Sequence, residues 1–241
     1  MPPNSLLHRR PHLNRLVWAF VLALAALIGG CAKFPPDSTV LGSKRLIFTF
    51  TVSGQINPNY VYIIALRPSN LANPTDSGPI PVVGPPWGNG FVAGNATYFV
   101  RWDPTTAPAY TLYQFQDILL TQYFAIGVPV AYTDLLPNGK TLTFQLDLTQ
   151  LASTPDAAAA YQSIQVNFLT MDRVPQGTTG SKAWDALGNG GDPAQINDYI
   201  TIPLTINGIY NNARYNNLEP TNDVADPDLD ISDFSVEVRS S

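Results

Sequence analysis

The 241-residue chain has 13 basic and 18 acidic residues and a formal net charge of −5. Its basic residues are scattered rather than clustered, which excludes a nucleic-acid partner, because such partners need concentrated positive charge to displace counterions. Its only histidines are His8 and His12, and Cys31 is its only cysteine. The region after Cys31 therefore has no Ser-His-Asp or Cys-His catalytic group, no dithiol and no His/Cys metal site.

The first 30 residues have the order of parts found in an export signal. Arg9, Arg10 and Arg15 form a positive start, residues 16–28 form an uncharged apolar stretch, and the small residues Gly29 and Gly30 follow. A stable membrane-spanning helix needs about 20 apolar residues, so the stretch is short for a span. We therefore predict a cleaved signal peptide over residues 1–30; an uncleaved signal anchor is the alternative.

The residues Ile28-Gly29-Gly30-Cys31 resemble the lipobox of bacterial lipoproteins, with Ile28 where that family prefers Leu. The resemblance implies cleavage before Cys31 by signal peptidase II, and acylation of Cys31 as the link to a lipid bilayer. Two or more acyl chains anchor a protein stably. The expected location is the extracytoplasmic side of the cell envelope. In an organism with two membranes it is the outer membrane, because Ala32-Lys33 lacks the aspartate of a retention signal.

Removal of the leader leaves 10 basic and 18 acidic residues, a net charge of −8. Residues 31–43 contain Pro35-Pro36 and small polar residues, which predicts a tether. Residues 44–241 are long enough to bury a core without a disulfide, and we predict a single domain there.

From Lys44 onward the chain is a series of short runs with apolar alternation, separated by turns rich in Pro, Gly, Asn and Asp. The period of two is typical of half-buried strands, and antiparallel sheets with one solvated face give this pattern. The strands are expected at residues 46–52, 60–66, 96–102, 110–115, 142–148, 164–168, 200–206 and 234–238. Asn138-Gly139 predicts a hairpin, and Pro203 an edge or bulge.

These observations predict an all-β fold, an antiparallel β-sandwich of immunoglobulin-like or jelly-roll type. Residues 155–162 (PDAAAAYQ) are the one segment that favours a short helix.

An acidic tail near the end of the chain is a candidate calcium site. Asp226, Asp228 and Asp230 have the spacing of the first ligands of an EF-hand loop, and Asp233 follows. Ile231 stands where that loop needs Gly, and a strand rather than a helix is expected next. We therefore expect either a looser calcium site at these four aspartates or a solvated acidic turn.

The aromatic residues Trp87, Tyr60, Tyr62 and Trp102 are candidates for ligand binding. Trp87 lies in a loop of Pro and Gly residues, so we expect its indole near the surface, where it would stack on a sugar ring. The alternative is that Trp87 folds back over the edge of a sheet.

The segment from Asp185 to Asp192 (DALGNGGD) lacks the pattern of a phosphate-binding loop. It predicts a flexible loop, with oxygen ligation of an ion by Asp185 and Asp192 as the alternative.

We expect a non-enzymatic envelope lipoprotein that binds a glycan or a protein, or serves in structural assembly, with calcium as a candidate cofactor. The alternative is a glycosidase that uses two carboxyl groups. Its candidate carboxylates are Asp103, Asp117, Asp172 and Asp185.

Overall fold

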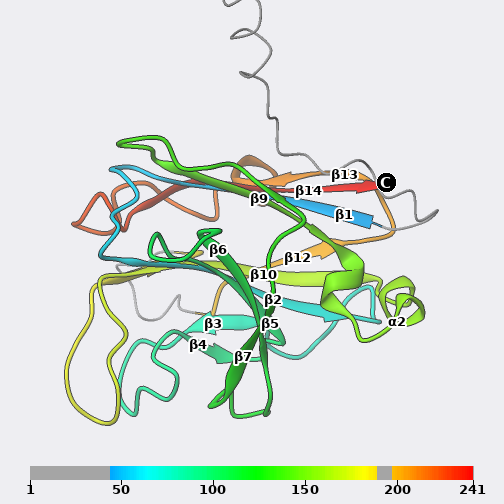
Figure 1. Ribbon diagram of the computed structural model, residues 1–241, viewed down its shortest axis with the longest axis horizontal. Coiled ribbons are helices and arrows are strands. Elements are labelled where there is room, and N and C mark those ends of the chain that lie inside the picture. The colour runs from blue at the N-terminus through cyan, green and yellow to red at the C-terminus, as the bar shows by residue number, and fades with distance from the viewer. Residues whose placement is uncertain (1–43, 189–196, 241) are drawn as a thin grey trace, which may run out of the picture. The chain divides into compact units, whose positions relative to one another are not determined.

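The computed structural model describes residues 44–188 and 197–240, which form two antiparallel sheets packed face to face (Figure 1). The smaller sheet has the strand order β13-β14-β1-β9-β8. Its strands are β1 (Lys44–Val52), β8 (Ala131–Tyr132), β9 (Thr141–Asp147), β13 (Gly208–Asn211) and β14 (Ile231–Ser240). The all-β sandwich predicted from the sequence is confirmed; its immunoglobulin-like or jelly-roll type stays a prediction.

The larger sheet has the order β11-β10-β2-β5-β6-β7, with β12 also paired to β10. Its strands are β2 (Val61–Ser69), β5 (Tyr98–Trp102), β6 (Tyr110–Phe115), β7 (Tyr123–Gly127), β10 (Ser163–Met171), β11 (Trp184–Ala186) and β12 (Ile200–Pro203). A short pair, β3 (Pro79–Pro81) and β4 (Val92–Gly94), lies outside both sheets. Pro203 ends β12, which pairs with β10 alone, as the predicted edge position requires.

The core between the sheets is built by the alternation seen in the sequence. In β1, Leu46, Phe48, Phe50 and Val52 are fully buried, and the residues between them are partly exposed. β1 lies between β14 and β9, so its buried side chains meet those of both neighbours. Such burial of aromatic rings supplies much of the hydrophobic stabilisation of a sandwich.

The two central strands of the larger sheet are buried on both faces. Every residue of β10 and the first six residues of β2 are buried. One face of these strands contacts the core between the sheets, and the other contacts a second apolar cluster. That cluster includes Phe91 from the segment between β3 and β4, which covers this face. The run at residues 60–66, apolar at every position, is explained by this double burial.

Helices are short. The helix predicted at residues 155–162 is present but shorter, as α2 (Pro155–Ala159). Its N-cap Thr154 accepts a hydrogen bond from the backbone N–H of Ala157. Two 3₁₀ turns, η1 (Leu148–Leu151) and η3 (Asn212–Tyr215), complete the helical elements of the described residues. None of the helices in this part of the chain has the length and apolar character needed to cross a membrane.

The hairpin predicted at Asn138-Gly139 is confirmed, because β8 and β9 are consecutive antiparallel strands on either side of this turn. The N–H of Gly139 donates to the carbonyl of Leu136 at 2.8 Å, which makes Pro137 and Asn138 the central residues. Asn138 has a φ of 57°, which the third position of a type II turn requires. The predicted signal peptide, the tether, Cys31 and Asp192 lie outside the described residues.

Candidate functional site

The acidic tail is held by hydrogen bonds to the loop between β1 and β2. Asp226 accepts from the Tyr60 hydroxyl at 2.7 Å and from its neighbour, the backbone N–H of Asp228, at 3.0 Å. Asp228 accepts from the backbone N–H of Gln55 at 2.8 Å and from the side chain of Asn57 at 3.3 Å. Both carboxylates therefore accept hydrogen bonds from other groups of the protein.

The remaining two aspartates of the tail also accept hydrogen bonds from the protein. Asp230 is buried and accepts from the Ser53 hydroxyl and from the backbone N–H of Asn222. Asp233 accepts from the backbone N–H of Phe234 at 2.9 Å. Asp226, Asp228, Asp230 and Asp233 are not among the described acidic groups whose oxygens converge. A calcium site at these four residues stays a prediction; in the structure each of the four carboxylates accepts a hydrogen bond from the protein itself.

The aromatic candidates are mostly inside the protein. Trp87, Tyr62 and Trp102 are 3%, 0% and 5% exposed, and the indole N–H of Trp87 donates to the carbonyl of Thr179 at 2.9 Å. Tyr62 and Trp102 pack edge to face in the core at 6.0 Å between ring centroids. The expectation that Trp87 stands at the surface is wrong: its Pro- and Gly-rich loop turns the ring inward. Tyr60 is the one candidate that is only partly buried.

The aspartates suggested for a glycosidase lie in separate local hydrogen-bond arrangements. Asp103 accepts from Thr105, Asp117 from Thr121 and Gln122, and Asp172 pairs with Arg173. Hydrogen bonds from Thr105 and Thr121 respectively lower the pKa of Asp103 and of Asp117. A surface cavity of about 420 Å³ lies beside Trp87, and its lining, from residues of 80–94 and 118–120, contains no Asp or Glu.

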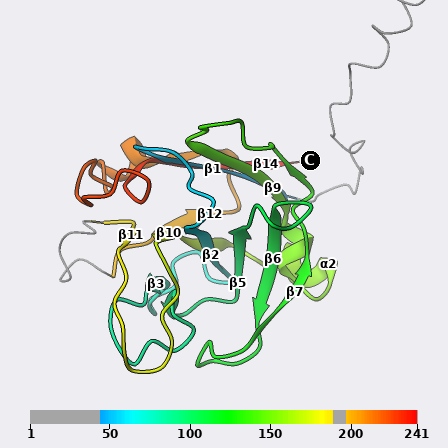
Figure 2. The ribbon, with the colours of Figure 1, turned by 60° about the vertical axis from the view of Figure 1, so that its left-hand side comes forward.

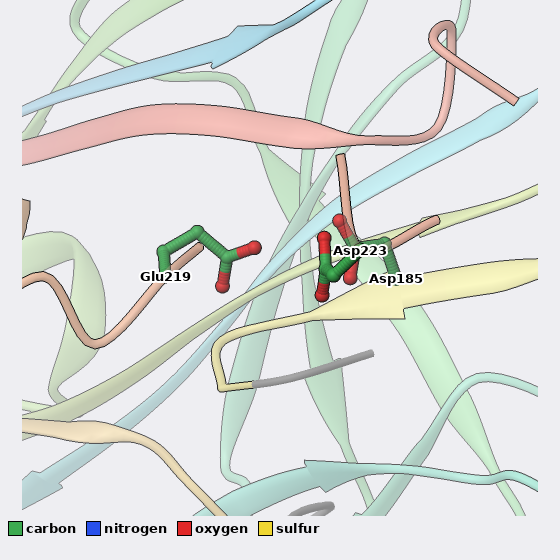
Figure 3. Close-up of side chains that lie close together, drawn as sticks. All are labelled: Asp185, Glu219 and Asp223. Carbon is green, nitrogen blue, oxygen red and sulfur yellow. The ribbon is translucent and has the colours of Figure 1, made fainter. Parts of the chain in front are cut away.

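A different group of carboxylates converges (Figure 3). Asp185, Glu219 and Asp223 each offer a carboxylate oxygen, and these oxygens all lie within 4.8 Å of one another. Asp185 is in β11, which pairs with β10, whereas Glu219 and Asp223 lie in the segment between η3 and β14. Asp185 and Glu219 are 0% and 1% exposed. The group therefore joins the edge of the larger sheet to the segment that leads into β14 of the smaller sheet.

Glu219 is fixed by the side chain of Asn212 at the start of η3. The Asn212 amide donates to the carbonyl of Glu219 at 2.7 Å and its oxygen accepts from the N–H of Glu219 at 2.9 Å. Oε2 of Glu219 accepts from the N–H of Gly188 at 3.1 Å. Oε1 is buried and has no hydrogen-bond partner. Figure 3 shows this carboxylate directed toward Asp185 and Asp223.

Asp185 is held by backbone donors. Its Oδ1 accepts from the N–H of Ala186 at 2.9 Å and its Oδ2 from the N–H of Ile231 at 2.7 Å. Burial, together with the charges of Asp223 and Asp230, nevertheless raises the pKa of Asp185 to about 8. Burial, together with the charges of Asp185 and Asp223, raises the pKa of Glu219 to about 11. Burial and neighbouring negative charge thus both disfavour the ionised forms of these two carboxyl groups.

A second feature of functional interest is the edge strand β7, at the outer side of the larger sheet (Figure 2). All five residues of β7 are exposed, including Tyr123, Phe124 and Ile126. Nearby Ile118 and Leu119 are 87% and 78% exposed. An exposed apolar strand at a sheet edge is unusual in a soluble domain, because it offers unpaired backbone groups for pairing with another chain.

No protein-family model, curated protein or solved structure matches this chain.

Of the three residues Asp185, Glu219 and Asp223, only Asp185 is a candidate from the sequence, where it is considered together with Asp192. Glu219 and Asp223 lie too far from Asp185 in the chain to form a motif with it, so no local sequence signal identifies them. β7 was missed because its residues (YFAIG) show no alternation.

Proposed function

We propose that this protein is a lipid-anchored, non-enzymatic module of the cell envelope that binds a protein partner through the free edge of β7. The exposed apolar edge strand carries the proposal, with the lipobox as support for the anchor. A protein is favoured over a glycan because Trp87, Tyr62 and Trp102 are buried, whereas β7 offers backbone donors and acceptors beside apolar side chains. Strand addition uses this combination.

The register of β7 defines which backbone groups face outward. The N–H of Gln116 donates to the carbonyl of Gln122 at 2.9 Å, and Phe115 pairs with Tyr123 in the next position. Hydrogen-bonded and non-hydrogen-bonded pairs alternate along an antiparallel ladder. The pairs Phe115–Tyr123 and Tyr113–Ala125 are therefore non-hydrogen-bonded, so the N–H and C=O of Tyr123 and Ala125 point to the free edge.

The remaining edges of the two sheets are shorter. Among the described strands, β8 has two residues, β11 three, and β12 and β13 four each, whereas β7 has five. β7 has no charged residue and no proline, the usual devices that block pairing at an edge. It is therefore the edge best suited to accept a further strand.

The anchor is tested by metabolic labelling with a fatty acid in the native host, comparing the full chain with Cys31→Ser. We expect label in the membrane fraction for the unaltered chain, and an unlabelled, unprocessed product for the variant. Equal labelling of both proteins would show that Cys31 is not the acylated residue.

Binding is tested by replacing Phe124 with a photo-crosslinking amino acid in the full chain, in cells. The same replacement at Leu71, an exposed loop residue, is the control. We expect a discrete crosslinked protein from position 124 and none from position 71. Ala125→Pro removes an outward N–H while keeping the β6–β7 bonds, and should abolish that product, whereas Ala125→Ser should keep it. No product from position 124, or one that survives Ala125→Pro, would contradict strand addition.

A further inference from the structure

We propose that Asp185, Glu219 and Asp223 bind a calcium ion that links β11 to the segment leading into β14. This site is distinct from the partner-binding edge of β7 and from the acidic tail in which the sequence pattern suggested calcium. Two independent observations point to it: the convergence of three carboxylates, and a buried glutamate oxygen directed into the group without a hydrogen-bond donor.

The donor atoms define the class of ion. The three side chains offer only carboxylate oxygens, which hard cations prefer. Ca²⁺ binds oxygen at about 2.3–2.6 Å, so two oxygens on opposite sides of one ion lie about 5 Å apart at most. The oxygens of Asp185, Glu219 and Asp223 lie within 4.8 Å of one another, inside this limit. Sites for zinc and copper usually include nitrogen or sulfur ligands, which the described residues do not offer here.

Glu219 is the decisive residue because its Oε1 has no donor in a nearly water-free position. Burial of a carboxylate oxygen without a partner lowers stability. Hydrogen bonds with the Asn212 side chain and from the N–H of Gly188 nevertheless hold Glu219 in this position. A cation between the three carboxylates supplies the missing interaction. In the described structure, no Lys or Arg forms an ion pair with Asp185 or Glu219.

The charges around the group favour a divalent cation. Asp223 and Asp230 act on Asp185, and Asp185, Asp223 and Asp230 act on Glu219; all of these groups are acidic. Four carboxyl groups crowded together lose solvation and repel one another, and a bound Ca²⁺ offsets two of their charges.

The ion would stabilise a junction between the two sheets. Asp185 already accepts from the N–H of Ile231, the first residue of β14. Asp223 and Glu219 lie on the chain shortly before that strand. A shared ion fixes all of these segments to β11, so the unfolding free energy should rise with calcium concentration.

The test is thermal unfolding of the full chain in detergent, first with chelator and then with added CaCl₂ or MgCl₂ to about 10 mM. This range exceeds the dissociation constants of about 10⁻⁴–10⁻³ M typical of extracellular calcium modules. At 100-fold excess over the dissociation constant, the melting temperature should rise by about 5–10 °C. Isothermal titration should give one calcium ion per chain.

Glu219→Gln is the decisive variant, because it keeps the shape of the side chain and removes a ligand charge. It should melt no lower than the unaltered chain in chelator, since an unpaired buried carboxylate is gone, and it should lose the calcium shift. Asp228→Asn, in the acidic tail, is the matched control and should keep the shift. Asp223→Asn gives a second test if Glu219→Gln does not fold.

Three results would overturn the proposal. They are no calcium shift in the unaltered chain, a shift that persists in both Glu219→Gln and Asp223→Asn, or a shift lost only in Asp228→Asn. An equal response to magnesium would overturn the assignment of calcium as the preferred ion.

Discussion

The hydroxyl of Tyr60 donates to Oδ2 of Asp226 at 2.7 Å and so joins two segments that are 166 residues apart in the chain. Tyr62 makes a parallel connection: its hydroxyl accepts from the N–H of Asn57 at 2.8 Å and donates to the carbonyl of Asp228 at 2.9 Å. The two tyrosines hold the acidic tail against the start of β2. These two hydrogen-bonded contacts fix the position of the acidic tail relative to β2.

Tyr60→Phe should lower the unfolding free energy by about 1 kcal/mol, the usual net value of one hydrogen bond. The loss arises because Asp226 keeps its charge but loses its hydroxyl donor. Urea unfolding of the variant and the unaltered chain measures the difference. Tyr199→Phe, which removes a long, exposed 3.4 Å hydrogen bond, is the control and should have almost no effect. Equal effects for the two variants would show that the contact to Asp226 contributes nothing.

Asn167→Ala should be more damaging, because Asn167 is fully buried and makes three hydrogen bonds. Its amide donates to the carbonyls of Pro79 and Asp198, both at 3.0 Å, and its oxygen accepts from the N–H of Leu187 at 3.1 Å. Removal leaves buried backbone groups without partners, so we expect a loss of at least about 2 kcal/mol in urea unfolding.

The control for this variant is Asn95→Ala, whose amide donates to Ser77 at the surface. It should cost about 1 kcal/mol or less, because water replaces the lost contact. Similar losses at the two positions would contradict a special role for the buried amide.

Lys182 should make stability depend on pH in the alkaline range. Burial lowers the pKa of Lys182 to about 8, with Asp172 opposing the shift, and its Nζ donates to the carbonyl of Gly90 at 2.7 Å. The ordinary pKa of lysine is about 10.4. The unfolded chain therefore binds more protons between about pH 8 and pH 10, so the Lys182 contribution to the unfolding free energy rises across this range.

The measurement is urea unfolding of the unaltered chain and of Lys182→Met at about pH 8 and about pH 10. The difference between the two proteins isolates Lys182, because other groups, such as the buried tyrosines, titrate in both. The unaltered chain should gain stability relative to the variant as the pH rises. A constant or falling difference would show that the folded pKa of Lys182 is not lowered.

The main strands were predictable because their side chains alternate between core and solvent. The positions of Phe48, Phe50 and Phe144 in the core follow from period two alone. Short strands such as β8 and β11 were not predictable, since two or three residues carry no period. β7 was missed for a different reason: its residues show no alternation of apolar and polar side chains, although the Tyr123 ring packs against Phe91 and Phe99.

The group of Asp185, Glu219 and Asp223 could not be predicted from the sequence, because contacts between distant parts of the chain bring these residues together. Asp185 lies in β11 and is positioned by its pairing with Thr170 in β10. Glu219 is positioned by a hydrogen bond from the side chain of Asn212. Neither interaction has a local sequence signature. Trp87 shows the opposite error. Its loop composition predicted exposure, but the carbonyl of Thr179, 92 residues away, provides the acceptor that holds the indole inside.

The position of β1 has a mechanical consequence. β1 begins at Lys44 and pairs with β14 on one side and β9 on the other along almost its whole length. A pull on the chain at Lys44 along the strand direction loads these hydrogen bonds in shear, so many must break together rather than one after another. A module tethered at this end and engaged at β7 would therefore resist extraction of its first strand, and tension between anchor and partner would be borne by the centre of the smaller sheet.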